Sequence, residues 1–287
     1  MTRDTTPRTA TPQTTAPQTP TPRTAPPQAS AQAFTALHHR PGTPLLLPNA
    51  WDHASAAALA AEGFEAIGTT SLGVAAAAGL RDGEGAAREE TLVVARRLGR
   101  GGPLLSVDAE GGFSDDPAEV AAFAAQLAQA GAVGINLEDG RADGTLTPVA
   151  VHAAKVAAVK AAVPHLFVNA RTDTHWLRSA GPDETEARLA AYRQAGADGV
   201  FVPGLSDPDR IAALVRAVGL PLNILYAPDG PSVAELAALG VARVSLGSLL
   251  FRRALGAAVS AAMDVREGRR PAGPVPAYQQ VQALSEG

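Results

Sequence analysis

The chain has no cysteine among its 287 residues. A disulfide framework, a thiolate metal site and a cysteine acting as nucleophile or acid are therefore all excluded. Lysine is almost as scarce, because Lys155 and Lys160 are the only two, and both lie in an Ala/Val-rich stretch that we interpret as a surface helix. A Schiff-base aldolase needs a lysine buried beside its substrate. The sequence offers no such residue, which argues against that class.

The chain also lacks a strong charge of either sign and any long apolar run. The formal net charge is −4, which leaves no basic face for nucleic acid or for an anionic membrane. No apolar run approaches the ~20 residues of a membrane-spanning helix. We therefore expect a cytoplasmic protein whose partners are small molecules, with neither nucleic acid nor membrane among them.

Residues 1–30 differ from the rest of the chain. They contain ten Thr and seven Pro, but no Val, Ile, Leu, Phe, Tyr or Trp. Such a segment cannot bury enough apolar surface to offset the entropy of ordering, so we predict a disordered tail. The prolines prevent an amphipathic targeting helix, and an apolar signal segment is missing. Residues 31–287 are predicted to form one domain.

From Ala31 onward, short apolar runs alternate with longer Ala-rich helical stretches. Apolar strands that alternate with helices indicate a parallel sheet covered by helices, and eight such units close a (β/α)₈ TIM-type barrel. A doubly wound open sheet is the alternative, but its glycine-rich phosphate turn is missing after the first strand. The predicted strands are Leu45–Ala50, Ala66–Thr70, Leu104–Glu110, Gly134–Asp139, Leu166–Thr172, Gly199–Gly204, Leu222–Ala227 and Arg243–Gly247.

Acidic residues collect where the third and fourth of these strands end, which is the side of a barrel that carries the active site. Asp108 and Glu110 are two residues apart on a strand, so both point to the same side, and Glu138 ends the next strand. Converging carboxylates repel one another unless a cation lies among them, and hard oxygen ligands favour Mg²⁺. The alternative is that these acids cap helices or pair with arginines.

Basic and polar residues follow the later strands. Arg171, at the end of the fifth strand, is suited to hold a substrate carboxylate with two hydrogen bonds, or else to pair with Glu138 or Asp173. His175 lies beyond it as a candidate acid or base, with a solvated loop position as the alternative. Gly247 and Ser248 could bind a phosphate, although a plain helix start is favoured. Tyr226 either faces the site or packs. His38, His39, His152 and His165 are expected at the surface, and His53 at a helix start.

Three ordered motifs carry a family resemblance. Asp108-Ala-Glu-Gly-Gly-Phe113, then Asn136-Leu-Glu-Asp139, then Asn169-Ala-Arg-Thr-Asp173 resemble the isocitrate lyase/phosphoenolpyruvate mutase superfamily. The likeness runs from about Phe34 to Ala262. It includes Arg81-Asp82 after the second strand and Thr70-Ser71-Leu72, where the family holds the substrate carboxylate.

The resemblance implies that Asp108 binds Mg²⁺ directly, while Asp82, Glu110 and Glu138 hold it mainly through water. It further implies that Arg171 and the segment Thr70, Ser71 and Leu72 grip the acidic groups of the substrate. Members of the superfamily break or form C–C or P–C bonds next to a 2-oxo acid by way of an enolate. Their last helices are often exchanged between subunits, so the long Leu249–Arg266 segment suggests a dimer or a tetramer.

The chain also departs from the family. The lyase branch carries a catalytic Cys loop, which is absent here. The mutase and phosphonopyruvate hydrolase branches place Lys and Asn on a gating loop that reads Gly-Arg-Ala-Asp-Gly-Thr-Leu at residues 140–146. Our first hypothesis is an Mg²⁺-dependent C–C lyase or related hydrolase of a short 2-oxo or 2-hydroxy carboxylate. A non-catalytic barrel that binds metal and carboxylate, a P–C bond enzyme and a phosphate-binding biosynthetic barrel are the alternatives.

Overall fold

The computed structural model describes residues 27–100, 102–178 and 182–285. Helix α1 (Pro27–Leu37) begins inside the predicted tail, so the prediction of disorder is wrong for residues 27–30. The reason is packing that composition does not reveal: Ser30 and Ala31 are buried, and Phe34 is fully buried. The rest of the predicted tail, residues 1–26, lies outside the described residues.

The strands form a closed parallel barrel, as predicted. Segments β1 and β2 are the two halves of one strand, interrupted at Pro48, which has no N–H to donate. β1 pairs with β9 and β2 pairs with β3, so this strand closes the ring and the count is eight. The strands are β1 (Leu45–Leu47), β2 (Asn49–Ala50), β3 (Ala66–Thr69), β4 (Leu104–Asp108), β5 (Ala132–Glu138), β6 (Phe167–Arg171), β7 (Gly199–Phe201), β8 (Leu222–Leu225) and β9 (Arg243–Ser245).

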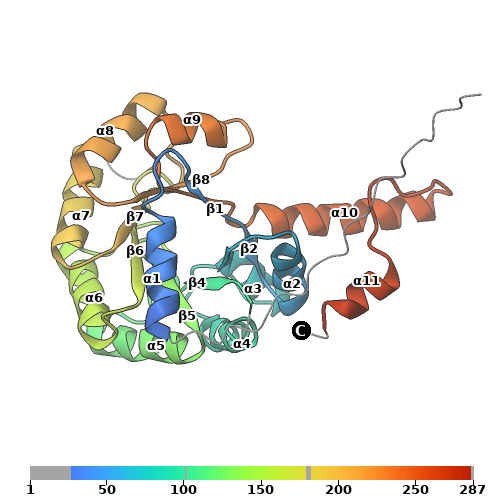
Figure 1. Ribbon diagram of the computed structural model, residues 1–287, viewed down its shortest axis with the longest axis horizontal. Helices are drawn as coiled ribbons and strands as arrows, with labels where there is room; N and C mark the ends of the chain where they lie inside the picture. Colours follow the sequence, from blue (N-terminus) through green and yellow to red (C-terminus); the bar gives the residue numbers. More distant parts are fainter. Residues whose placement is uncertain (1–26, 101, 179–181, 286–287) are drawn as a thin grey trace, which may run out of the picture.

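Helices surround the barrel, as Figure 1 shows. Several begin at a side chain that caps the first turn, such as Asp116, Asp207 and Ser232. The glycines that follow helices and precede strands at positions 63, 131, 196 and 240 all have positive φ, a conformation that ends a helix. The helices after α1 are α2 (His53–Ala61), α3 (Ser71–Ala77), α4 (Arg88–Leu98), α5 (Pro117–Gln129), α6 (Val149–Ala162), α7 (Pro182–Gln194), α8 (Pro208–Val218), α9 (Val233–Ala238), α10 (Leu249–Arg266) and α11 (Tyr278–Ala283).

Helix α1 covers the N-terminal ends of the strands. The ring of Phe34 lies 5.5 Å from that of Phe167, the first residue of β6. A Cβ at Gly134 would lie 2.7 Å from Phe34, so this glycine in β5 makes room for the ring. The base of the barrel is therefore closed by apolar packing, and the opposite end is left for polar residues.

Three residues predicted at the surface are buried. Lys155 on α6 points inward, where its Nζ donates to the carbonyl of Gly111 at 3.1 Å and pairs with Asp115 at 3.0 Å. His38 stacks on Phe167 and His152 packs edge-on against Tyr192. The predictions for Lys155 and His152 were wrong because their Ala-rich helix has no clear polar face in sequence. The prediction for His38 was wrong because this residue, just after α1, packs with the helix against the barrel. His39 and His165 are exposed and His53 starts α2, as expected.

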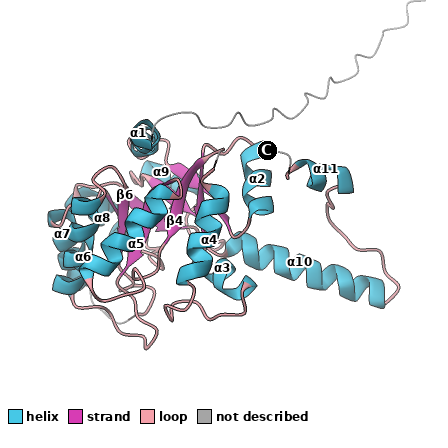
Figure 2. Cartoon of the chain, turned by 90° about the horizontal axis from the view of Figure 1, so that it is seen from below, coloured by secondary structure: helices cyan, strands magenta, loops and turns pink. Residues whose placement is uncertain are grey.

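Helix α10 leaves the barrel. Its first turn packs through Phe251 on Trp51, with ring centroids 5.3 Å apart, and the helix then projects away from the ring (Figures 1 and 2). None of its 18 residues is buried. No helix in the described part of the chain is long and apolar enough to cross a membrane.

Candidate active site

The predicted acids come together at the C-terminal ends of β4 and β5. Asp108 and Glu138 are the last residues of these strands, and Glu110 lies in the turn after β4 with a left-handed φ of 47°. Asp82 arrives on the segment between α3 and α4. Its pKa responds to the charges of Asp108 and Arg171, which places all these groups in one cluster.

Neighbouring backbone holds the acids in place. The N–H of Asp108 donates to Thr69 Oγ1 at 2.8 Å, and the N–H of Ser71 lies 3.4 Å from Asp108 Oδ2. The N–H of Gly85 donates to Glu110 Oε2 at 3.2 Å. The segment after β3 thus folds over the end of β4 and contributes donors from two points.

The cluster brings several carboxylates together in a buried place where their ionised forms are disfavoured. Burial raises the pKa of Glu110 to about 7, with the charges of Asp108 and Asp82 adding to the effect and the N–H of Gly85 opposing it. Burial also raises the pKa of Asp82 and holds that of Glu138 well above its usual range, although Arg171 opposes both shifts. Desolvation and like charge both disfavour the ionised carboxylates, so a bound cation would relieve the cluster.

Individual oxygen atoms also fit a cation. Asp108 Oδ1 and Glu110 Oε1 are buried without a hydrogen-bond partner. Among the described residues, no group of three or more His, Cys, Asp or Glu side chains is arranged to hold a metal ion directly. Mg²⁺ keeps several waters and is usually bound by one or two carboxylates. The donor set therefore fits Mg²⁺ bound by Asp108, with the other acids acting through water.

Arg171, the last residue of β6, makes the ion pairs that the sequence offered as its alternative role. Its Nη1 lies 2.6 Å from Glu138 Oε2, an approach not aligned as a hydrogen bond. Its Nε and Nη2 donate to Asp173 at 2.6 and 3.1 Å. Burial alone would lower its pKa, but Glu138 and Asp173 raise it above the usual value. A guanidinium has five N–H donors, and Asp173 accepts hydrogen bonds from two of them, so donors on Nη1 and Nη2 remain for a ligand.

The segment predicted to bind the substrate lies beside the acids. Thr70 is buried and precedes the first turn of α3, and Leu72 lies in that turn. Ser71 contacts both Asp108, through its N–H, and Asp82, through its side chain. The structure therefore brings Thr70, Ser71 and Leu72 next to the proposed metal-binding carboxylates.

His175 is placed differently. It is half-buried in the segment after β6, against the backbone of Gly204. Burial and the charge of Arg210 lower its pKa, and none of the clustered carboxylates acts on it. The charge that acts on His175 is thus that of Arg210, and no contact between His175 and the clustered acids accompanies it.

The sequence also offered Gly247, Ser248 and Tyr226 as candidate site residues with structural alternatives. The N–H groups of Leu246 and Gly247 donate to Asn49 Oδ1 at 3.0 and 2.8 Å, so the chain itself uses these amides. Gly247 and Ser248 therefore form a plain helix start before α10, the favoured reading. Tyr226 packs against the apolar cluster beneath α8 and α9.

Sequence reasoning missed a buried arginine beneath the acids. Arg243 of β9 is 1% exposed; its Nε donates to Ser245 and its Nη2 donates to Asn136 Oδ1 across the barrel. Burial lowers its pKa to about 9, and the charge of Asp108 opposes that shift. Its position at the start of β9 gave no signal of burial, because an inward and an outward residue look alike when both faces of a strand are covered.

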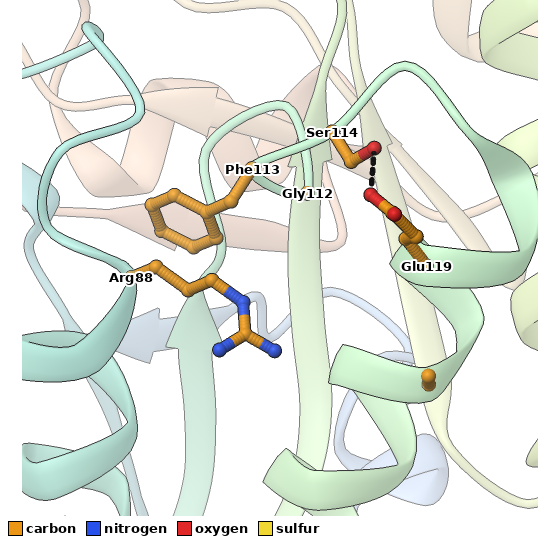
Figure 3. A pocket seen from close by; sticks show the side chains of 6 residues that line it. Arg88, Gly112, Phe113, Ser114 and Glu119 are labelled. Carbon is orange, nitrogen blue, oxygen red and sulfur yellow. Dashed lines mark hydrogen bonds between the residues drawn. The ribbon is translucent and has the colours of Figure 1, made fainter.

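A cavity of about 340 Å³ lies beside the acidic cluster, outside the barrel. It is lined by Arg88 from α4, by residues 112–114 of the turn after β4, and by Glu119 and Ala122 from α5 (Figure 3). One wall is fixed by Ser114, whose Oγ donates to Glu119 at 2.6 Å. None of the clustered carboxylates lines this cavity.

Comparison with known proteins gives concordant matches. Residues 34–266 match the profile of the family described as phosphoenolpyruvate phosphomutase. An uncharacterized protein of Mycobacterium tuberculosis is 47% identical over 252 residues, which cover 88% of this chain and 95% of that protein. The phosphoenolpyruvate phosphomutase of Streptomyces hygroscopicus is 34% identical over 248 residues, 80% of this chain and 76% of that enzyme. The crystal structure of a candidate lyase/mutase from Burkholderia cenocepacia superimposes with a TM-score of 0.83 at 38% identity, covering 91% of this chain and 97% of that one.

Proposed function

Because this chain belongs to the phosphoenolpyruvate mutase/isocitrate lyase superfamily, we propose that it is an Mg²⁺-dependent enzyme that cleaves a C–C bond beside a 2-oxo or 2-hydroxy carboxylate. Carbon–carbon lyases and phosphomutases both occur among its relatives, and the chain is an enzyme of this kind. The proposal of Mg²⁺-dependent C–C cleavage is supported by one observation. Asp108, Glu110 and Glu138 converge on Arg171 and leave an excess of buried negative charge.

Each residue has a chemical task in this proposal. Asp108, which has a buried carboxylate oxygen without a partner, would hold Mg²⁺, and Asp82, Glu110 and Glu138 would act through water. When bound there, the metal would supply a Lewis acid for negative charge that develops on a substrate oxygen. Arg171 binds the substrate carboxylate with N–H groups of Nη1 and Nη2 that Asp173 does not use, and the backbone at Ser71 closes the other side.

The loop over the site favours a lyase over a phosphoryl-transferring mutase. Its cation is Arg141, whose Nη2 pairs with Asp115 at 2.7 Å and whose Nε donates to Thr147 at 3.2 Å. Both contacts lie within the loops after β4 and β5, so this guanidinium is already engaged. A phosphoryl group in transfer is stabilised by cationic donors that are free to contact it. A small carboxylate substrate needs fewer such donors.

The proposed reaction can be tested directly. The purified protein is incubated with Mg²⁺ and a panel of 2-oxo and 2-hydroxy acids, and pyruvate release and C3-proton exchange in D₂O are followed by NMR. We expect turnover of at least one compound, abolished in Asp108→Ala and retained in Arg81→Lys, an exposed arginine on the same segment as Asp82. Binding of oxalate without exchange or cleavage of any compound would support a non-catalytic carboxylate-binding barrel instead.

We further propose that α10 and α11 pack against a second copy of the chain. The exposed residues Leu255 and Val259 lie four apart on α10 and share one face of it, and Tyr278 and Val281 are exposed on α11. Apart from the packing of Phe251 on Trp51 in its first turn, this 18-residue helix has no buried residue and gains little stability from its own barrel. A second copy would supply the missing partner surface.

A further inference from the structure

Asp139 is a fully buried carboxylate to which the proposed reaction assigns no task. It follows Glu138 at the end of β5 and accepts three hydrogen bonds. The hydroxyl of Tyr192 donates to Oδ2 at 2.6 Å, and Nη1 of Arg188 donates to the same oxygen at 3.1 Å. The backbone N–H of Asp173 donates to Oδ1 at 2.9 Å. Two residues of helix α7 are thus joined through Asp139 to the segment after β6.

The third of these contacts leads to the substrate-binding arginine. Asp173, whose backbone is held by Asp139, presents its carboxylate to Nε and Nη2 of Arg171. The space around that carboxylate is also restricted, because a Cβ at Gly140 would lie 2.2 Å from Asp173 Oδ2. Asp173 is therefore fixed at its backbone and at its side chain, and it fixes the guanidinium plane of Arg171.

The same cluster also holds the loop over the site. Nη1 of Arg188 donates to the carbonyl of Thr147 at 2.9 Å, and the N–H of Thr147 donates to the carbonyl of Asp139 at 2.7 Å. Residues 140 and 146 pair as an antiparallel bridge. The loop that begins at Gly140 therefore has its far end attached to the residues that orient Arg171.

Burial makes these contacts strong and directional. Asp139 is 0% exposed, so its charge is balanced by Arg188 and by the hydrogen bonds rather than by water. Burial and the charge of Asp139 raise the pKa of Tyr192 above its usual range, so the phenol stays protonated as a donor. A network of this kind allows little rotation to any of its members.

We propose that Tyr192 and Arg188 are positioning residues for substrate binding, acting through Asp139 and Asp173 to hold Arg171 in the orientation that receives the substrate carboxylate. The inference rests on the proposed function of Arg171. It goes further because it gives two side chains of an outer helix an effect on ligand affinity, although neither touches the ligand.

The test separates ligand binding from metal binding and from folding. Mg²⁺ affinity is measured by calorimetry, and oxalate affinity is then measured at saturating Mg²⁺, for the wild type, Tyr192→Phe and Arg171→Lys. Phenylalanine keeps the ring that packs on His152 and removes the hydroxyl donor to Asp139. Lys160→Met is the matched control. It removes the ion pair between Lys160 on α6 and Asp198, which lie 2.7 Å apart. Asp198 precedes β7, so this contact lies at the other end of the barrel.

We expect oxalate to bind about tenfold more weakly to Tyr192→Phe, the effect of losing one hydrogen bond to a charged group. Mg²⁺ affinity should be unchanged, and Lys160→Met should bind both ligands as the wild type does. Wild-type oxalate affinity in Tyr192→Phe, or an equal loss of Mg²⁺ affinity, would overturn the positioning role. If Arg171→Lys also binds oxalate normally, the proposed function of Arg171 fails instead. Should Tyr192→Phe not fold, Arg188→Lys, which keeps the charge but loses the branched donor, is expected to give the same selective loss.

Discussion

Replacing Arg171 with methionine tests whether this residue is also a structural ion-pair partner. Its side chain is 15% exposed and lies 2.6 Å from both Glu138 and Asp173, two carboxylates that are themselves buried. Removal of the guanidinium leaves both charges without a partner. The free energy of unfolding should fall by about 3–5 kcal/mol at pH 8, the usual cost of breaking a buried pair.

The loss should depend on pH in a defined direction. Burial already raises the pKa of Glu138 and of Asp173 in the folded protein, and Arg171 opposes both shifts. Without Arg171 the two folded-state pKa values rise further above those of the unfolded chain. Stability contributed by such groups is present at low pH and is lost as pH rises through the folded pKa. The difference between variant and wild type should therefore shrink as pH falls from 8 to 5.

Urea unfolding of both proteins at several pH values measures this difference. A second substitution, Asp173→Asn, serves as the control, because the cost of losing Arg171 should be smaller once one of the two carboxylates has been neutralised. A loss below about 1 kcal/mol, or a loss that is the same at pH 5 and pH 8, would refute the buried ion-pair account.

Three further predictions concern parts of the chain outside the site. Burial lowers the pKa of His152 to about 3 in the folded protein. As pH falls below 6.5, the unfolded chain therefore binds a proton at this histidine before the folded protein does, which lowers the free energy of unfolding. Urea unfolding should show that His152→Phe loses about 2–3 kcal/mol less stability than the wild type between pH 7 and pH 4.5. Phe34→Ala should cost about 3–5 kcal/mol in the same assay because the ring is fully buried at the barrel base, whereas a change below 1 kcal/mol would mean that α1 contributes little. Aspartates at Leu255 and Val259 should convert a dimer or tetramer into monomers in analytical ultracentrifugation, and an unchanged sedimentation coefficient would contradict the proposed packing of α10.

The barrel could be predicted because its signals are local. Apolar runs alternate with helical stretches along the chain. The prediction that Asp108 and Glu110 lie on one strand is wrong, because β4 ends at Asp108 and Glu110 lies in the turn after it. Spacing by two residues also made Asp173 a foreseeable partner of Arg171, since alternate residues on an extended backbone face the same side. These inferences need only the period of the strand and the side of the barrel that carries polar residues.

Other features depend on contacts between distant segments. Tyr192 reaches Asp139 across 53 positions of sequence, and nothing in its helix distinguishes it from an ordinary packing residue. Lys155 was expected at the surface because its surroundings are Ala and Val, although its amino group finds Asp115 in a neighbouring loop. Ser30 was assigned to a polar tail, but packing against the barrel decides the start of α1. In each case tertiary packing, rather than local pattern, fixes the outcome.

The central claim is that Asp108 anchors an Mg²⁺ ion through which the site binds a carboxylate. Calorimetric titration of Mg²⁺ in the presence of oxalate, with wild type, Asp108→Ala and Asp82→Asn, tests it most directly. Asp108→Ala removes the proposed direct ligand and should abolish measurable binding. Asp82→Asn changes a water-mediated contact and should weaken binding by about tenfold or less, as expected for outer-sphere partners. Equal Mg²⁺ affinity in the wild type and in Asp108→Ala would contradict the account.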